Sequence, residues 1–133
     1  MEKALVVALD LGNDEDFLYD LEELCQLCEA CDMEVVETVI QRADAMNKAL
    51  FIGTGKALEV KETAALNEAQ IVVFNESLSP MQVRNLQNEI ELPILDRTTL
   101  ILDIFSRRAK TREAKVQVET ARLQYLLPRL AGL

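Results

Sequence analysis

The sequence predicts an α/β domain with a small four-stranded parallel sheet flanked by helices, followed by an all-helical C-terminal tail. Strand-like and helical segments alternate up to residue 96 with short connections, which favours a parallel sheet with helices on its faces. Beyond residue 96 no segment has a strand pattern. We therefore expect an α/β subdomain over residues 1–96 and a basic helical segment over residues 97–133.

The first half of the subdomain predicts two strands around one helix. The apolar run at about residues 4–9 is typical of a strand, and the Gly12–Asn13 turn leads into a helix with Asn13 or Asp14 as its N-cap. Residues 14–30 space their apolar side chains by three and four, as an amphipathic helix does. MEVVETVI predicts the second strand, QRADAMNK a loop, and ALFIG a short strand or an extended entry to the next helix.

The second half adds two helices and two strands. GKALEVKETAALNEA predicts a helix, and IVVF is apolar throughout, as a strand covered on both faces would be. In SLSPMQ, Ser79 can cap a helix, Pro80 suits its first position, and Gln82 completes a reciprocal capping box. This helix should run to about Ile90, Pro93 stops it, and LPILD supplies the last strand.

The tail predicts two helices. Asp96 can cap the first, TTLILDIFSRRA, and the second, TREAKVQVETARLQYLLP, should end near Pro128. The second helix also carries a seam of the kind that a partner helix normally covers, with steps of four, three and four residues: Val116, Thr120, Leu123 and Leu127.

Length and composition limit the possible classes of protein. With 133 residues, half of them apolar, the chain can bury one hydrophobic core. No apolar run approaches the roughly 20 residues of a membrane-spanning helix. The acidic residues that soon follow ALVVAL do not fit a signal peptide. We expect a soluble, cytoplasmic protein without a membrane partner.

The net charge of −9 is unevenly distributed. Residues 1–96 carry 6 Lys and Arg against 20 Asp and Glu, whereas residues 97–133 carry 8 against 3. An acidic surface repels a polyanion and a basic one attracts it. A nucleic-acid partner would therefore have to meet the C-terminal segment.

Three cysteines, Cys25, Cys28 and Cys31, form a C-x-x-C-x-x-C pattern. On a loop this spacing could bind a metal ion or an iron–sulfur cluster. Here it falls on a predicted helix, where the outer two residues are attached roughly 9 Å apart along one rod. Because the chain has no histidine and glutamates nearby disfavour thiolate, we predict buried thiols and no metal site.

The stretch FIGTGKALEV resembles the front of a nucleotide-binding loop but lacks two of its requirements. In G-x-x-x-x-G-K-[ST], a glycine precedes the second glycine by five positions and a hydroxyl follows the lysine. Leu50 and Ala57 occupy those positions here. We predict that Gly53 and Gly55 form a tight turn into a helix, with a weak anion site at the helix N-terminus as the alternative.

The sequence also predicts no catalytic residues. Without histidine, neither a Ser-His nor a Cys-His pair can exist, so we expect no self-contained enzyme and no cofactor in this chain.

Three segments, LSPMQVRNL, DRTTLILDIFSRRAKTRE and QVETARLQYLLPRL, resemble the N-terminal region of the HflX family of ribosome-associated GTPases. The resemblance covers residues 49–133 and is merely compatible with residues 1–48. It implies a four-stranded parallel α/β subdomain and a helical hairpin, of which residues 97–133 are the first part, followed in the family by a G domain that binds GTP and Mg²⁺. It also implies docking on the large ribosomal subunit and a role in ribosome splitting or rescue.

The resemblance does not carry GTP hydrolysis over to these residues. The second hairpin helix, the glycine-rich tip and the G domain of the family have no counterpart in this sequence. We therefore expect an excised fragment rather than a natural short relative, with the missing G domain as its partner in the parent protein.

The tail offers basic side chains that could contact phosphates of ribosomal RNA, which positions a protein without reading sequence. The candidates for this role are Arg107, Arg108, Lys110 and Arg112 at the junction of the two helices, and Lys115 and Arg122 on the second helix. A solvated basic face, with Glu113 and Glu119 in local ion pairs, is the alternative.

Two other functions stay open. The first is a stand-alone protein-interaction or dimerisation module without an RNA role. It would form a homodimer through the second tail helix, because its apolar side chains would otherwise lack cover: Val116, Leu123, Tyr125 and Leu127. The second, weaker possibility is a small nucleotide-binding enzyme that uses the GTGK turn.

Overall fold

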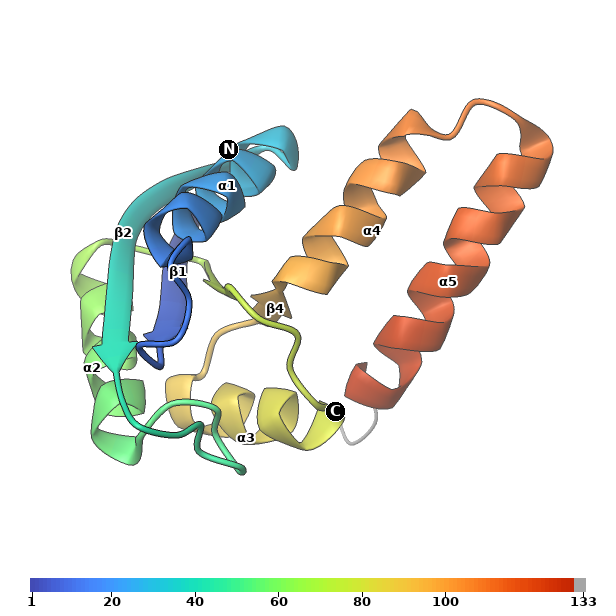
Figure 1. Cartoon of the computed structure of the whole chain (residues 1–133). Helices are drawn as coiled ribbons and strands as arrows, with labels where there is room; N and C mark the ends of the chain where they lie inside the picture. The colour runs from blue at the N-terminus through green and yellow to red at the C-terminus, as the bar shows by residue number, and fades with distance from the viewer. Residues whose placement is uncertain (131–133) are drawn as a thin grey trace.

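The computed structural model describes residues 1–130 and contains one four-stranded sheet with five helices (Figure 1). All strand pairs are parallel and the strand order is β2-β1-β3-β4. The strands are β1 (Glu2–Asp10), β2 (Met33–Arg42), β3 (Ile71–Phe74) and β4 (Ile94–Asp96). The predicted fold class is therefore confirmed. The last three residues of the predicted tail, 131–133, lie outside the described residues.

Helices cover both faces of the sheet. The helices that contribute buried side chains are α1 (Phe17–Ala30), α2 (Thr54–Leu66), α3 (Pro80–Ile90) and α4 (Arg97–Arg108), and the fifth helix is α5 (Arg112–Leu130). The buried side chains of α2 and α3 share one cluster, while those of α1 and α4 share the other. The central strand β1 sends alternate residues into the two clusters, which explains its unbroken apolar run.

Two of the predicted helix caps are confirmed. At the start of α3, the Ser79 hydroxyl accepts from the Gln82 N–H (3.1 Å), and the Gln82 side chain accepts from the Ser79 N–H (3.0 Å). At the start of α4, the Asp96 carboxylate accepts from the Thr99 N–H (3.0 Å). These bonds satisfy main-chain donors that a helix start leaves without partners.

The first helix starts about one turn later than predicted. Helix α1 begins at Phe17, and its N-cap Asp16 makes no capping bond through its side chain. Instead, the carboxylate of Asp14 accepts from the Asp16 N–H (2.9 Å). Asp14 therefore stabilises a turn ahead of the helix, because Asp side chains compete for nearby main-chain donors.

ALFIG is not a strand. Phe51 has a φ of 67° and forms an isolated antiparallel bridge with Asn47. The Asn47 side chain accepts from the N–H groups of Ala49 and Leu50, both at 2.9 Å. The turn is closed by these bonds and held by the Phe51 ring, which meets Phe74 edge-on at a centroid distance of 5.9 Å.

Helices α4 and α5 form an antiparallel hairpin that projects from the sheet and its covering helices (Figure 1). Helix α4 starts directly after β4, and α5 returns along it until its C-terminal end packs on α3. No residue of α5 is buried over residues 112–130. Within the part of the chain that the structure describes, no helix is long and apolar enough to span a membrane.

Candidate nucleic-acid interface

The turn between α4 and α5 lies at the end of the hairpin that is remote from β4 (Figure 1). Thr111 directly precedes α5 and caps it, because its hydroxyl accepts a hydrogen bond from the Ala114 N–H (3.0 Å). Four exposed basic side chains surround this turn, and within residues 1–130 none of them forms an ion pair. We call this group the basic tip: Arg108, Lys110, Arg112 and Lys115.

The other two predicted contact residues have partners of their own. Arg107 pairs with Asp32 (2.9 Å) and with Asp103 (3.0 Å), which ties α4 to the turn between α1 and β2. The hydrogen bonds that Arg107 donates to these two carboxylates raise its pKa. Arg122 is partly buried and pairs with Glu119 (3.2 Å). The structure therefore separates the six predicted residues into four with free charges and two in local ion pairs.

Asp96 connects the base of the hairpin to the sheet. Asp96 is only 1% exposed, and both of its carboxylate oxygens accept hydrogen bonds. Oδ1 accepts from the N–H (3.0 Å) and the hydroxyl (2.9 Å) of Thr99. Oδ2 accepts from the Leu78 N–H (2.9 Å) and from the hydroxyl of Tyr125 on α5. This buried carboxylate is fully bonded, as burial of a charge requires.

Arg129, one turn beyond Tyr125, completes this attachment. It donates to the carbonyl of Leu78 (2.8 Å) and to that of Tyr125 (2.7 Å), with its guanidinium 3.5 Å from the centroid of the Tyr125 ring. Burial, and then the hydrogen bond to Asp96, raise the pKa of Tyr125. We call Asp96, Tyr125 and Arg129 the hairpin anchor.

The prediction that Tyr125 lacks cover is wrong, because it belongs to the hairpin anchor. The other apolar side chains of the predicted seam are exposed: Val116 by 59%, Leu123 by 48% and Leu127 by 60%. We keep the name α5 seam for these three residues. Only the four-residue spacing of Tyr125 and Arg129 points to the hairpin anchor in the sequence, because their partners Asp96 and Leu78 are distant in the chain.

Arg97 contributes to the basic charge of the tail but is held within the fold. It donates to the carbonyl (3.2 Å) and side chain (2.7 Å) of Asn75, to the Asp20 carbonyl (2.6 Å), and to Glu23 (2.5 Å). Arg97 therefore fastens the start of α4 to α1 and to the turn after β3 through four hydrogen bonds.

The GTGK turn is confirmed as a helix start. Gly53 is the N-cap of α2, and its N–H donates to the side chain of Gln41 (3.0 Å). A Cβ at Gly53 would lie 3.1 Å from the same side chain, so a larger residue would crowd it. Lys56 pairs with Glu59 (2.8 Å). Two groups that could meet a phosphate here, the Gly53 N–H and the Lys56 ammonium, therefore have protein partners.

The cysteines lie along the inner side of α1. Cys28 and Cys31 are buried, which confirms that part of the prediction, whereas Cys25 is only partly buried. Burial raises the pKa of Cys28 to about 12, and burial together with Asp103 raises that of Cys31 to about 11. Residues 14–30 were predicted as one amphipathic helix, but Leu18 on the first turn of α1 is 72% exposed.

A metal site would need several ligands in one place. Over residues 1–130, no three side chains of His, Cys, Asp or Glu come close enough together to hold a metal ion.

Two family models cover nearly all of the chain past residue 18. The model described as GTP-binding GTPase N-terminal matches residues 19–106, and the model described as GTP-binding GTPase Middle Region matches residues 108–133. The solved structure of a GTP-binding protein from the archaeon Sulfolobus solfataricus in complex with GDP is similar in fold. Its TM-score is 0.70 at 28% identity, over 98% of this chain and 38% of that protein.

Curated relatives match over almost the whole chain. The GTPase HflX of Alkalihalophilus pseudofirmus is 44% identical over 99% of this chain, and the GTPase HflX of Escherichia coli is 40% identical over 97%. The chain spans 31% and 30% of the length of these two relatives. The chain therefore belongs to the HflX family of GTPases, and its residues correspond to the family's N-terminal region, without the G domain.

Proposed function

We propose that this chain is the ribosome-binding module of an HflX-like GTPase and that its basic tip contacts RNA of the large ribosomal subunit. The basic tip is the observation that carries the proposal. Four positive side chains without ion-pair partners within residues 1–130 are gathered at the projecting end of a hairpin. A cluster of this kind neutralises phosphates and releases counterions, whichever bases are present.

The charge of the rest of the molecule supports one orientation on the RNA. Residues 1–96 carry 14 more acidic than basic side chains, since 20 Asp and Glu oppose 6 Lys and Arg. Repulsion would keep this part away from a polyanion while the basic tip approaches it. Arg107 and Arg97 already bind protein carboxylates, so they set the position of the hairpin rather than meet phosphate.

In the whole protein, a separate G domain would bind GTP with Mg²⁺ and hydrolyse the nucleotide. The module described here would direct that activity to the large subunit during ribosome splitting or rescue in the cytoplasm. Its own residues would supply attachment, and the Gly53 N–H and the Lys56 ammonium of the GTGK turn are already bonded to Gln41 and Glu59.

Co-sedimentation with purified large ribosomal subunits tests the proposal. We expect a variant with all four residues of the basic tip changed to Gln to bind at least about tenfold more weakly, because phosphate contacts dominate such affinities. A matched control removes four positive charges elsewhere: Lys3, Arg42, Lys48 and Lys61, each to Gln. The control should bind like the original chain. Equal losses in the two variants would show that only net charge matters and would contradict the proposal.

Self-association is a second candidate function, which the exposed α5 seam favours. Three apolar side chains on one helix give a drive to associate, and a self-complementary face closes into a two-fold dimer. Light scattering of the original chain should then show a dimer, and Leu123→Asp should convert it to a monomer. Gln117→Asp, an exposed change on the same helix, should leave the dimer intact. An original chain that is already monomeric would exclude this function.

A further inference from the structure

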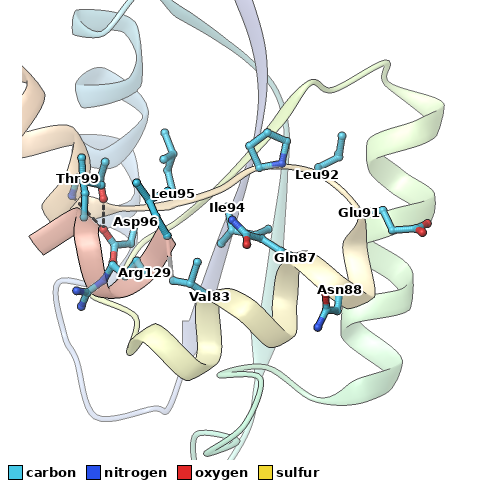
Figure 2. A pocket seen from close by; sticks show the side chains of 13 residues that line it. Val83, Gln87, Asn88, Glu91, Leu92, Ile94, Leu95, Asp96, Thr99 and Arg129 are labelled. Carbon is cyan, nitrogen blue, oxygen red and sulfur yellow. Dashed lines mark hydrogen bonds between the residues drawn. The ribbon is translucent and has the colours of Figure 1, made fainter. Parts of the chain in front are cut away.

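The sheet has two outer strands, β2 and β4, and the fold covers them to different extents. Strand β4 has only three residues, and a cavity of about 550 Å³ beside it is walled by α3 and by the C-terminal end of α5 (Figure 2). Strand β2 has ten residues and lies at the edge of the sheet away from the hairpin (Figure 1). Helices α1 and α2 pack on its two faces, but no strand of residues 1–130 pairs with its outer edge.

The main chain of β2 presents hydrogen-bonding groups at this outer edge. Just after the strand, the Ala43 N–H donates to the Asp10 carbonyl of β1 (3.1 Å), and the register with β1 is regular from Glu37 onward. Because main-chain groups alternate in direction along a strand, the N–H and C=O groups of Thr38 and Ile40 point away from β1. An open edge of this kind offers bonds to another polypeptide.

Glu37 covers one of these groups. Its carboxylate accepts from the Thr38 N–H (2.8 Å), which agrees with the outward direction of that N–H. Glu37 is exposed, so water competes for both groups and the bond contributes little to stability. A main-chain carbonyl of an added strand could therefore replace the carboxylate at low cost and leave the charge of Glu37 free for another partner.

The charge around this edge is negative. Residues 4–41 carry 11 Asp and Glu and no Lys or Arg. Glu34 and Glu37, both exposed on β2, form no ion pair within residues 1–130. Three of the eleven acidic residues do form one: Asp10, Glu23 and Asp32. A surface of this kind repels nucleic acid and attracts a cationic polypeptide.

Strand β2 also offers apolar contacts. Val36 and Ile40 are only partly buried, although both belong to the strand. Branched side chains of this type pack well against apolar neighbours on an adjacent strand. A segment that fits the edge therefore combines basic side chains with apolar ones.

We propose that the outer edge of β2 binds an extended, basic segment of another protein, which joins the sheet as a further strand. Lys or Arg side chains of the segment pair with Glu34 and Glu37, and its apolar side chains lie against Val36 and Ile40. Its main chain bonds to Thr38 and Ile40. This mode of recognition takes affinity from main-chain bonds and specificity from side chains. The module would then bind RNA through the basic tip and a protein through the opposite edge of the sheet.

A second copy of the chain is a poorer occupant of this edge. An antiparallel pairing of two β2 strands would place the two α1 helices next to each other on the same face of the joined sheet. Each α1 has four acidic residues and no basic one: Asp20, Glu22, Glu23 and Glu29. Repulsion between these helices opposes the pairing.

Selection from a phage-displayed library of random heptapeptides, using the 133-residue chain as bait, provides the probe. The selected peptides are synthesised with blocked ends, and their affinity is measured by calorimetry. We expect Lys or Arg to recur in them together with apolar residues. Changing Glu34 and Glu37 together to Gln should weaken binding by about tenfold, because two exposed ion pairs are lost. Glu62 and Glu89, exposed and without ion pairs within residues 1–130, changed together to Gln are the matched control and should have no effect.

The fold of the double variant needs a separate check. Its urea midpoint should equal that of the original chain, because the amide oxygen of glutamine can still accept from the Thr38 N–H. A loss of affinity with an unchanged midpoint then belongs to binding.

Two measurements distinguish strand addition from attraction between charges alone. In hydrogen exchange, the peptide should slow the amide of Ile40, while the amide of Val39, which faces β1, should be slow with or without peptide. Methylation of alternate main-chain nitrogens of the peptide should abolish binding in one register and leave it in the other, because a strand bonds to its neighbour through every second residue.

A selection that yields no binding peptide, or only acidic ones, would overturn the proposal. Equal affinity of a selected peptide for the double variant and for the original chain would do the same. An Ile40 amide that becomes slow as the concentration of the free chain rises would assign the edge to a second copy and would likewise contradict the proposal.

Discussion

The α/β body (residues 2–96) and the α4–α5 hairpin (residues 97–130) are held together by different forces. In the body, β1 is buried between two apolar clusters that contain side chains of α1, α2 and α3, and Leu100 and Ile104 of α4 join one of them. In the hairpin, α5 buries no residue and is attached at its base by the polar bonds of the hairpin anchor. The body is therefore stabilised by packing, and the position of α5 depends on a few hydrogen bonds.

The same division separates stability from recognition. Apolar burial leaves the surface of the body acidic, whereas the hairpin presents the basic tip and the exposed α5 seam. Exposed apolar patches and patches of a single charge sign are both typical of interaction sites. A rigid body that carries a lightly attached, basic hairpin is suited to docking.

The largest expected contrast concerns core packing. Leu86→Ala, in the buried face of α3, should lower the free energy of unfolding by about 2–5 kcal/mol, because it loses burial and leaves a cavity. Leu127→Ala, on the exposed α5 seam, should change it by no more than about 0.5 kcal/mol. Urea unfolding measures both. Similar losses at the two positions would mean that α5 is part of the core after all.

A smaller effect is expected at the hairpin anchor. Tyr125→Phe removes a hydrogen bond to a buried carboxylate, which contributes about 1.5–3 kcal/mol. Hydrogen exchange should become faster along α5 while β1 stays protected, because only the attachment is weakened. Tyr19→Phe, an exposed change on α1, is the control and should alter neither. Faster exchange in β1 as well would show that hairpin and body unfold together.

The pKa shifts of the two buried cysteines predict a loss of stability in alkali. The pKa values of Cys28 and Cys31, about 12 and about 11 in the folded chain, are above their ordinary value of 9.0. Above pH 9 the unfolded chain gives up these protons first, so the free energy of unfolding should fall as the pH rises towards 12. Urea unfolding under reducing conditions checks this, and Cys28→Val should reduce the slope. An unchanged slope in that variant would assign the effect to other groups, such as Tyr125.

Local patterns predicted the body well. The buried strands have apolar, β-branched sequences, and the caps at Ser79 and Asp96 involve residues three positions apart. The prediction of a short strand or extended segment for ALFIG is wrong, because the conformation there depends on a turn closed by Asn47 and on the contact between Phe51 and Phe74. Such contacts do not alter the spacing of apolar residues from which strands and helices are predicted.

The candidate site was predictable only where its residues are close together in the sequence. The four residues of the basic tip lie within residues 108–115, so the local excess of Lys and Arg reveals them. The ion pairs of Arg107 with Asp32 and of Arg97 with Glu23 join residues more than 70 positions apart, and so do not show in local patterns. The hairpin anchor likewise depends on how α5 returns to the sheet.

The salt dependence of binding to large ribosomal subunits tests the central claim most directly. For the original chain, the logarithm of the binding constant should fall linearly with the logarithm of salt concentration. Changing the four residues of the basic tip to Gln should lower the magnitude of that slope by up to about one unit for each lost phosphate contact, while the four-residue control in the body keeps it. A slope that is the same in the original chain and the tip variant would place the ribosome-binding surface elsewhere.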